Sequence, residues 1–186
     1  MTTPPESPAY ATIREGISLR EQGRSPEAKA LMESLVADVE TGDDAYAKVF
    51  LAHSLADVQE NAEDELAWDL QALAFLDELT DQQALDRGNP GGKKALLPSL
   101  HLNLAVDYRR LGDDINAQRH FELGQAHLDA LSDDEYGTAS AAPSPRASKE
   151  SRCCPTLVLV ELFSAALTVG QAAETVIRRR GCCGMW

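Results

Sequence analysis

Residues 101–124, HLNLAVDYRRLGDDINAQRHFELG, contain two apolar, helix-like stretches on either side of Gly112-Asp113-Asp114. A glycine followed by two aspartates is typical of a tight turn, and helices commonly end just before a glycine. The pattern predicts one helix from about residue 95 to residue 111 and a second from about residue 115 to residue 131. We therefore expect the two helices to pack as an antiparallel hairpin.

The same pattern continues towards the N-terminus. Apolar residues at three- and four-residue spacing predict further helices near 13–22, 25–41, 44–60 and 63–79. Ser25 followed by Pro26 is typical of a helix start, with Ser25 as the cap. The polar stretch Thr80 to Lys94 contains Asn89-Pro90-Gly91-Gly92 and is expected to be a loop. Ala and Leu far outnumber Val and Ile, which also favours an all-α chain of six helices in three antiparallel pairs.

The third pair resembles the tetratricopeptide repeat (TPR), as found in bacterial-type TPR proteins. The motif positions are occupied by His101, Leu104, Ala105, Tyr108, Ala117, Phe121 and Gly124. The first pair matches through Gly16, Gly23, Ala28 and Met32, and the middle pair only through Ala67 and Ala74. The resemblance covers about residues 9–131 and implies a TPR-like solenoid over residues 9–135. The alternative is an ordinary six-helix bundle.

The C-terminal part has a different composition. The chain of 186 residues has a net charge of −13, yet its last part is basic and holds all 4 cysteines, Cys153, Cys154, Cys182 and Cys183. We expect a linker over 136–155 and an apolar, basic tail over 156–186. The tail is expected to be a capping helix or disordered, and a frame-shifted origin is a further hypothesis. A membrane-inserted tail is less favoured, because Glu161, Ser164 and Gln171 interrupt its apolar run.

Composition also restricts the class of protein. The hydrophobic fraction of 44% excludes wholesale disorder. A strongly acidic body repels phosphate backbones, so we expect no nucleic-acid partner. Residues 1–8 lack the basic and apolar regions of a secretory signal, which favours a cytoplasmic protein. No catalytic motif is recognisable, so we expect a protein that is not an enzyme. His101 and His120 without a placed carboxylate or thiol make a poor metal site, so we expect no metal and no cofactor.

The resemblance implies a concave groove that binds a peptide or a partner helix. The groove residues expected from the motif positions are Arg14, Ser99, Asn103, Val106 and Arg110. Asn103 lies where peptide-clamping members of the family bond the ligand backbone, and Arg14 is its equivalent in the first pair. The expected function is thus a protein-interaction scaffold whose partner has basic flanks. Alternatives are a regulatory module of a signalling or transcription complex and a membrane-associated adaptor that uses the apolar tail.

Overall fold

The computed structural model describes residues 7–89 and 91–133, with only the backbone described for 129–133. Within these ranges the chain is helical and contains no strand. The helices are α1 (Pro8–Glu21), α2 (Ser25–Glu33), α3 (Val36–Thr41), α4 (Ala45–Ala56), α5 (Ala62–Glu78), α6 (Asp81–Asp86), the 3-10 helix η1 (Gly92–Leu96), α7 (Leu97–Arg110) and α8 (Asp114–Asp133). The expected linker, 136–155, and the expected tail, 156–186, lie outside the described residues.

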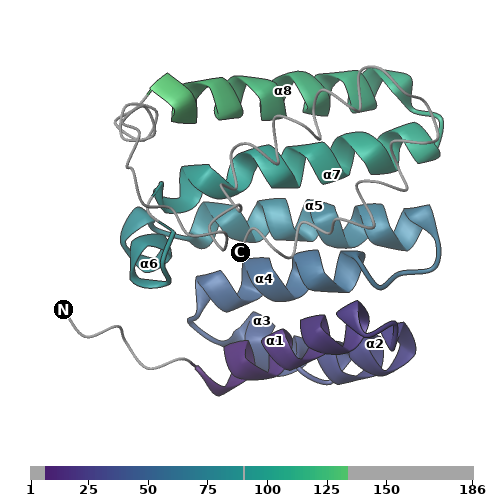
Figure 1. Ribbon diagram of the computed structural model, residues 1–186, viewed down its shortest axis with the longest axis vertical. Helices are drawn as coiled ribbons and strands as arrows, with labels where there is room; N and C mark the ends of the chain where they lie inside the picture. The colour runs from purple at the N-terminus through teal and green to yellow at the C-terminus, as the bar shows by residue number, and fades with distance from the viewer. Residues whose placement is uncertain (1–6, 90, 134–186) are drawn as a thin grey trace, which may run out of the picture.

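The helices form a stack in which each hairpin packs on the one before it in sequence. Helices α4, α5, α7 and α8 lie side by side as one layer with alternating directions (Figure 1). Helices α1 and α2 pair with each other at the end of the layer next to α4, and α8 forms the opposite end. The all-α prediction is therefore confirmed, and the three predicted pairs correspond to α1/α2, α4/α5 and α7/α8.

Several helix boundaries differ from the prediction. Helix α1 begins at Pro8 rather than near residue 13, and α4 ends at Ala56 rather than near residue 60. The predicted helix over 25–41 is divided into α2 and α3 at Ser34 and Leu35. The Ser34 hydroxyl donates to the Leu31 carbonyl oxygen at 2.6 Å, and a serine that bonds its own backbone in this way competes with the helical pattern. Ser25 is not a cap, because α2 already begins there and Arg24 takes the cap position without a side-chain bond.

The predicted loop Thr80 to Lys94 contains two short helices, α6 and η1. Thr80 caps α6, since its hydroxyl accepts from the Gln83 amide while the Gln83 side chain accepts from the Thr80 amide. This reciprocal pair is a capping box, and its Thr-x-x-Gln signature is present in the sequence. The loop prediction was therefore wrong for residues 81–86 and 92–94.

Glycine is required at the turn of the outer hairpins. Gly23 follows α1 and Gly112 follows α7, each with a φ of 78°, a value that side-chain-bearing residues rarely adopt. Gly16 has a different role, because a Cβ atom there would lie 2.7 Å from Met32 Cγ. Its missing side chain lets α1 and α2 approach closely.

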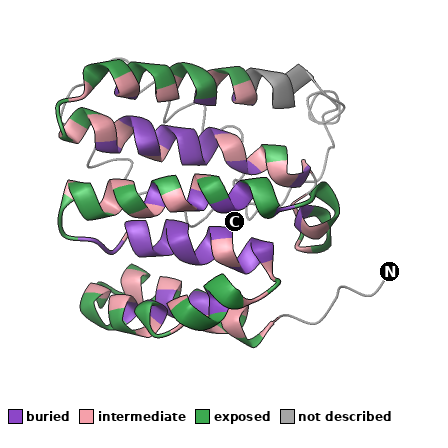
Figure 2. Cartoon of the chain, turned by 180° about the vertical axis from the view of Figure 1, so that it is seen from behind, coloured by how far each residue is buried: buried purple, intermediate pink, exposed green. Residues whose placement is uncertain are grey.

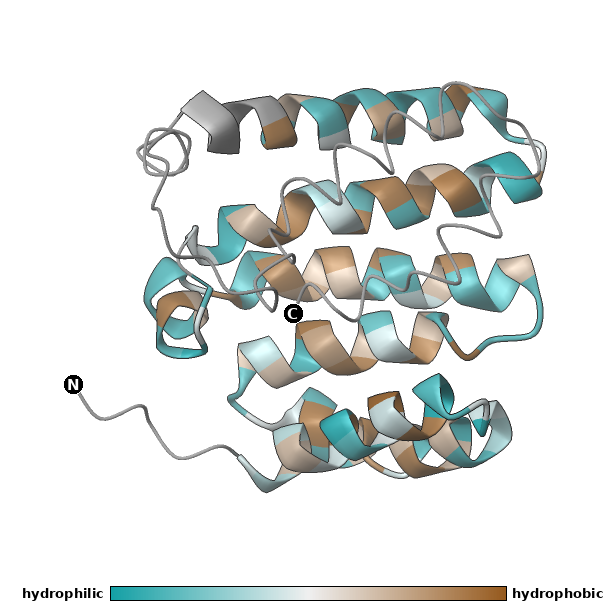
Figure 3. Ribbon diagram, in the orientation of Figure 1, coloured by the Kyte–Doolittle hydropathy of each residue, from teal (hydrophilic) through white to brown (hydrophobic). Residues whose placement is uncertain are grey.

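The core is densest around α4. Every residue of α4 except Lys48 is buried, including the polar His53 and Ser54 (Figure 2). The ring of Tyr10 on α1 meets the Tyr46 and Phe50 rings edge-on, at centroid distances of 5.7 and 5.1 Å. Figure 3 shows the apolar residues concentrated in the central helices and the hydrophilic ones more common at the helix ends.

Candidate functional site

Four of the five residues expected to line the groove lie on α7 and Arg14 lies on α1, and they differ in how far they are buried. Arg14 is exposed on α1, and Val106 is half-buried on α7. Ser99 is buried, and its hydroxyl donates to the Leu96 carbonyl oxygen at 3.0 Å, so it stabilises the start of α7. Asn103 and Arg110, which we expected to be exposed, are half-buried and bonded to other side chains. The polar groups of α7 are thus held inside the helix stack.

Asn103 belongs to a buried polar cluster, which we define as His53, Asp69, Asn103 and Asp107. His53 comes from α4, Asp69 from α5, and the other two from α7. His53 Nδ1 lies 3.3 Å from Asp69 Oδ1 and 3.2 Å from Asn103 Nδ2. His53, Asp69 and Asp107 expose only 1–2% of their surface. Three helices that belong to two hairpins are therefore joined by polar contacts in an otherwise apolar interior.

Burial changes the proton affinity of this cluster. Burial first, then the charges of Asp69 and Glu65 and a hydrogen bond with Asp69, together raise the pKa of Asp107 to about 9, against the lowering effect of Arg110. Burial also raises the pKa of Asp69, against the opposing effect of His53. Burial lowers the pKa of His53, but its hydrogen bond to Asp69 and the nearby charges of Asp57 and Asp69 outweigh this, and the net shift is upward.

These directions define the proton arrangement at neutral pH. Asp107 keeps its proton at neutral pH and shares a hydrogen bond with Asp69, and His53 Nδ1 lies 3.3 Å from the same Asp69 carboxylate.

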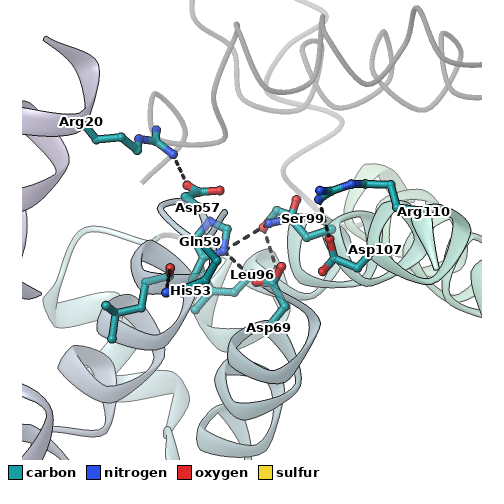
Figure 4. A network of polar contacts seen from close by, with 11 residues as sticks. Arg20, His53, Asp57, Gln59, Asp69, Leu96, Ser99, Asp107 and Arg110 are labelled. Carbon is teal, nitrogen blue, oxygen red and sulfur yellow. Dashed lines mark hydrogen bonds and ion pairs between the residues drawn. The ribbon is translucent and has the colours of Figure 1, made fainter. Parts of the chain in front are cut away.

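Two ion pairs lie on either side of the cluster. Figure 4 shows Arg20 with Asp57 on one side of His53 and Asp69, and Arg110 beside Asp107 on the other. Arg20 of α1 pairs with Asp57, which caps the end of α4, and Arg110 of α7 pairs with Glu65 of α5. The side chains of these four residues retain 12–21% exposure. We call the side of α1, α4 and α7 that carries this row the inner face. The four ion-pair side chains of this face are partly accessible, whereas His53, Asp69 and Asp107 between them are buried.

The histidines of the third hairpin come together as expected. His101 Nδ1 and His120 Nδ1 are 3.0 Å apart, His127 stacks on His101, and Tyr108 stacks on His120. Burial and the two neighbouring histidines lower the pKa of His101 to about 4. His101 is therefore neutral at pH 7, and burial and the charge of Arg119 also lower the pKa of His120. In the part of the chain that the structure describes, no group of three or more potential ligands is arranged to hold a metal ion.

Sequence reasoning missed His53, Asp69 and Asp107. The sequence does contain an indication of their burial. Two of these polar residues lie one helical turn from apolar residues on the buried side of their helix. Asp69 is one turn from the buried Ala72, and Asp107 is one turn from the buried Leu104. An acidic residue at a core position of a helix indicates a buried polar contact.

Comparison with known proteins gives no assignment: no family model matches the chain, and no curated protein or solved structure is significantly similar to it. Among the helices of the described ranges, none is both long enough and apolar enough to cross a membrane. The resemblance to the TPR family therefore remains a hypothesis, and the function has to be argued from the site itself.

Proposed function

We propose that this protein is a non-enzymatic interaction scaffold that binds a peptide or a partner helix along its inner face. One observation carries the proposal: the stack brings residues of three hairpins into one row of partly accessible polar side chains. The pairs Arg20–Asp57 and Glu65–Arg110 each join neighbouring hairpins, so these side chains are fixed before a ligand arrives. Side chains that are already ordered lose little entropy on binding, which favours affinity.

Charge supports a basic partner. The chain has 30 acidic and 17 basic side chains, so its net field attracts cations. A peptide with basic flanks would approach faster at low salt, because complementary charge mainly increases the association rate. Asn103 would bond a peptide backbone group, and Arg110 would accept a carboxylate of the ligand in exchange for Glu65.

A random peptide library displayed on phage tests the proposal with the full-length chain. We expect enriched sequences to be rich in Lys and Arg. A synthetic peptide of the enriched sequence should bind the double variant Asn103→Ala/Arg110→Ala about tenfold more weakly, since each lost hydrogen bond contributes ~0.5–1.5 kcal/mol. Calorimetry measures the affinity, and circular dichroism verifies that the variant is folded.

Arg119→Ala is the matched control, because it removes an exposed cation from α8, away from the inner face. It should bind the peptide as the wild type does. No enrichment of peptides, or equal affinity of the Asn103→Ala/Arg110→Ala variant and the wild type, would show that the inner face is not a binding site.

A further inference from the structure

Three histidines meet at the contact between α7 and α8. His101 comes from α7, and His120 and His127 lie two turns apart on α8. The Nδ1 atoms of His101 and His120 are 3.0 Å apart, and the ring of His127 is stacked on His101 with centroids 5.5 Å apart. Tyr108 of α7 stacks on His120 at a centroid distance of 5.4 Å. The three imidazoles therefore form part of the contact that holds the two helices together.

The bond between His101 and His120 tolerates one additional proton but not two. Two neutral imidazoles can form it, because one Nδ1 carries a hydrogen and the other offers a lone pair. If one ring becomes an imidazolium, it still donates to its neutral neighbour. If both rings do, each Nδ1 carries a hydrogen, so the bond is lost and two positive charges lie side by side.

The charges that act on these two rings are positive. Burial, followed by the charges of His120 and His127, lowers the pKa of His101 to about 4. Burial and the charge of Arg119 lower the pKa of His120. The surroundings of the pair, as far as the structure describes them, thus oppose its protonation.

The other charged groups of the packed elements do not reverse this effect. Glu122 of α8 is exposed, where water screens its charge, and it accepts a hydrogen bond from Gln118 at 2.8 Å. Asp107 of α7 faces α5 and keeps its proton at neutral and acidic pH. The 3-10 helix η1, which also packs on α8, contributes the cations Lys93 and Lys94.

Helix α8 is placed so that it can separate from the stack without unfolding the rest. It forms one end of the layer, and its main contacts with the described helices are to α7 and η1 (Figure 1). Opening of a terminal element costs less free energy than global unfolding. We propose that the three histidines make α8 an acid-sensitive latch, which is closed on α7 at neutral pH and released when His101 and His120 are both protonated. This inference goes beyond the proposed function and does not depend on it.

Proton binding sets the direction of the effect. The pKa of a histidine in an unfolded segment is ~6.5, whereas that of His101 in the closed hairpin is about 4, so the open state binds more protons between these values. The closed state is therefore fully favoured above pH ~6.5 and loses its advantage as the pH falls towards 4. His101 alone should raise the equilibrium constant for opening of α8 by roughly twentyfold between pH 7 and pH 5.

Hydrogen–deuterium exchange of the full-length protein at pH 7 and pH 5 measures the opening. Each amide rate is divided by the rate of an unstructured chain at the same pH, so that the ratio reports protection alone. We expect the protection of residues 114–128 in α8 to fall by about tenfold or more at pH 5. The amides of α1, α2, α4 and α5 should keep their protection and serve as the internal control.

Two variants test the role of the second proton. His101→Asn replaces the ring by an amide, which can bond His120 in either protonation state and does not titrate, so α8 should become much less sensitive to acid. His120→Phe is the second variant: it keeps a ring to stack on Tyr108 but carries no charge, and it should also weaken the dependence on pH. Glu122→Gln is the matched control, because it removes an exposed titrating group from the same helix and should open in acid as the wild type does.

Each comparison has a result that would overturn the proposal. The first is equal protection of α8 at pH 7 and pH 5. The second is an equal loss of protection in all described helices, which would indicate global unfolding by acid. The third is a His101→Asn or His120→Phe variant that opens as steeply with acid as the wild type. The measurement uses no ligand, so a failure of the peptide selection leaves its result intact.

Discussion

Asp69 and Asp107 place two carboxyl groups and His53 in an interior that excludes water. Two adjacent buried carboxylates cannot both ionise without a large free-energy cost, so one of them keeps its proton. The proton on Asp107 makes it a hydrogen-bond donor to Asp69 at neutral pH. The buried polar cluster is therefore stable only as long as this proton is retained.

Stability should decline as the pH rises. The pKa of Asp107 is about 9 in the folded chain and ~4 in an unfolded chain, so the native state binds more protons between these values. Its contribution is fully present below pH ~4 and is lost as the pH approaches 9, by on the order of 1 kcal/mol per pH unit. The upward shift of the His53 pKa has the same sign. Urea unfolding at several pH values between 5 and 9 measures the free energy of unfolding.

Asp107→Asn isolates this contribution. An amide has the shape of a protonated carboxyl group and does not titrate, so the variant should be the more stable protein at pH 8, with a flatter pH profile. Asp77→Asn on the exposed side of α5 is the control and should keep the profile of the wild type. A wild-type free energy of unfolding that is constant from pH 5 to pH 9 would contradict the buried protonated carboxyl.

Gly16 and Met32 should behave as a coupled pair. A methyl group on Gly16 would lie 2.7 Å from Met32 Cγ, so Gly16→Ala should destabilise the wild type by about 1–2 kcal/mol despite the better helix propensity of alanine. In a Met32→Ala background the same change should be neutral or stabilising, because the opposing atoms are gone. A double-mutant cycle on thermal unfolding measures the coupling, and additive effects would contradict the close approach of α1 and α2.

Individual residues were partly predictable from the sequence. The motif positions that the resemblance assigned to Gly16, Ala28 and Met32 are buried, and Gly16 lies against Met32 where the first pair meets. The polar contacts of Asn103 and Arg110 could not be predicted from the sequence, because their partners His53 and Glu65 are 50 and 45 residues away along the chain. Local patterns report which side of a helix is buried, but they do not report which distant side chain meets it.

At the scale of elements, the α7/α8 hairpin is the most regular unit. Leu104, Ala105 and Ala117 are buried where the two helices meet, as their spacing predicted. The same spacing did not predict the break between α2 and α3 or the short helix α6. Both depend on a side chain that bonds the backbone, Ser34 in one case and Thr80 in the other, and apolar periodicity does not detect such bonds.

Ala117→Leu should therefore overpack the hairpin. Ala117 is 2% exposed, and the additional methyl groups should lower the free energy of unfolding by about 1–3 kcal/mol. Ala126→Leu is the control, since Ala126 is exposed on the same helix and should change the melting temperature little. Equal melting temperatures of the wild type and Ala117→Leu would show that Ala117 does not face α7.

At the scale of the whole molecule, net charge opposes compactness. With a formal charge of −13, the folded chain repels itself, and salt screens this repulsion over a distance of about 8–10 Å at ordinary ionic strength. We expect the melting temperature to rise modestly between low salt and physiological sodium chloride, as measured by circular dichroism. A falling melting temperature would show that ion pairs such as Arg20–Asp57 outweigh the general repulsion.

The order of the hairpins along the chain gives the buried polar cluster a role in folding kinetics. The α4/α5 hairpin can form while the chain is still being synthesised, before α7 exists. Until then Asp69 lies next to water, hydrated and ionised beside His53. Arrival of α7 brings the second carboxyl group and removes the water, so this one step must capture a proton from the solvent. Docking of α7 on the α4/α5 hairpin is therefore coupled to proton uptake. The rate of this folding step should decrease in alkaline buffer, although no helix changes its shape.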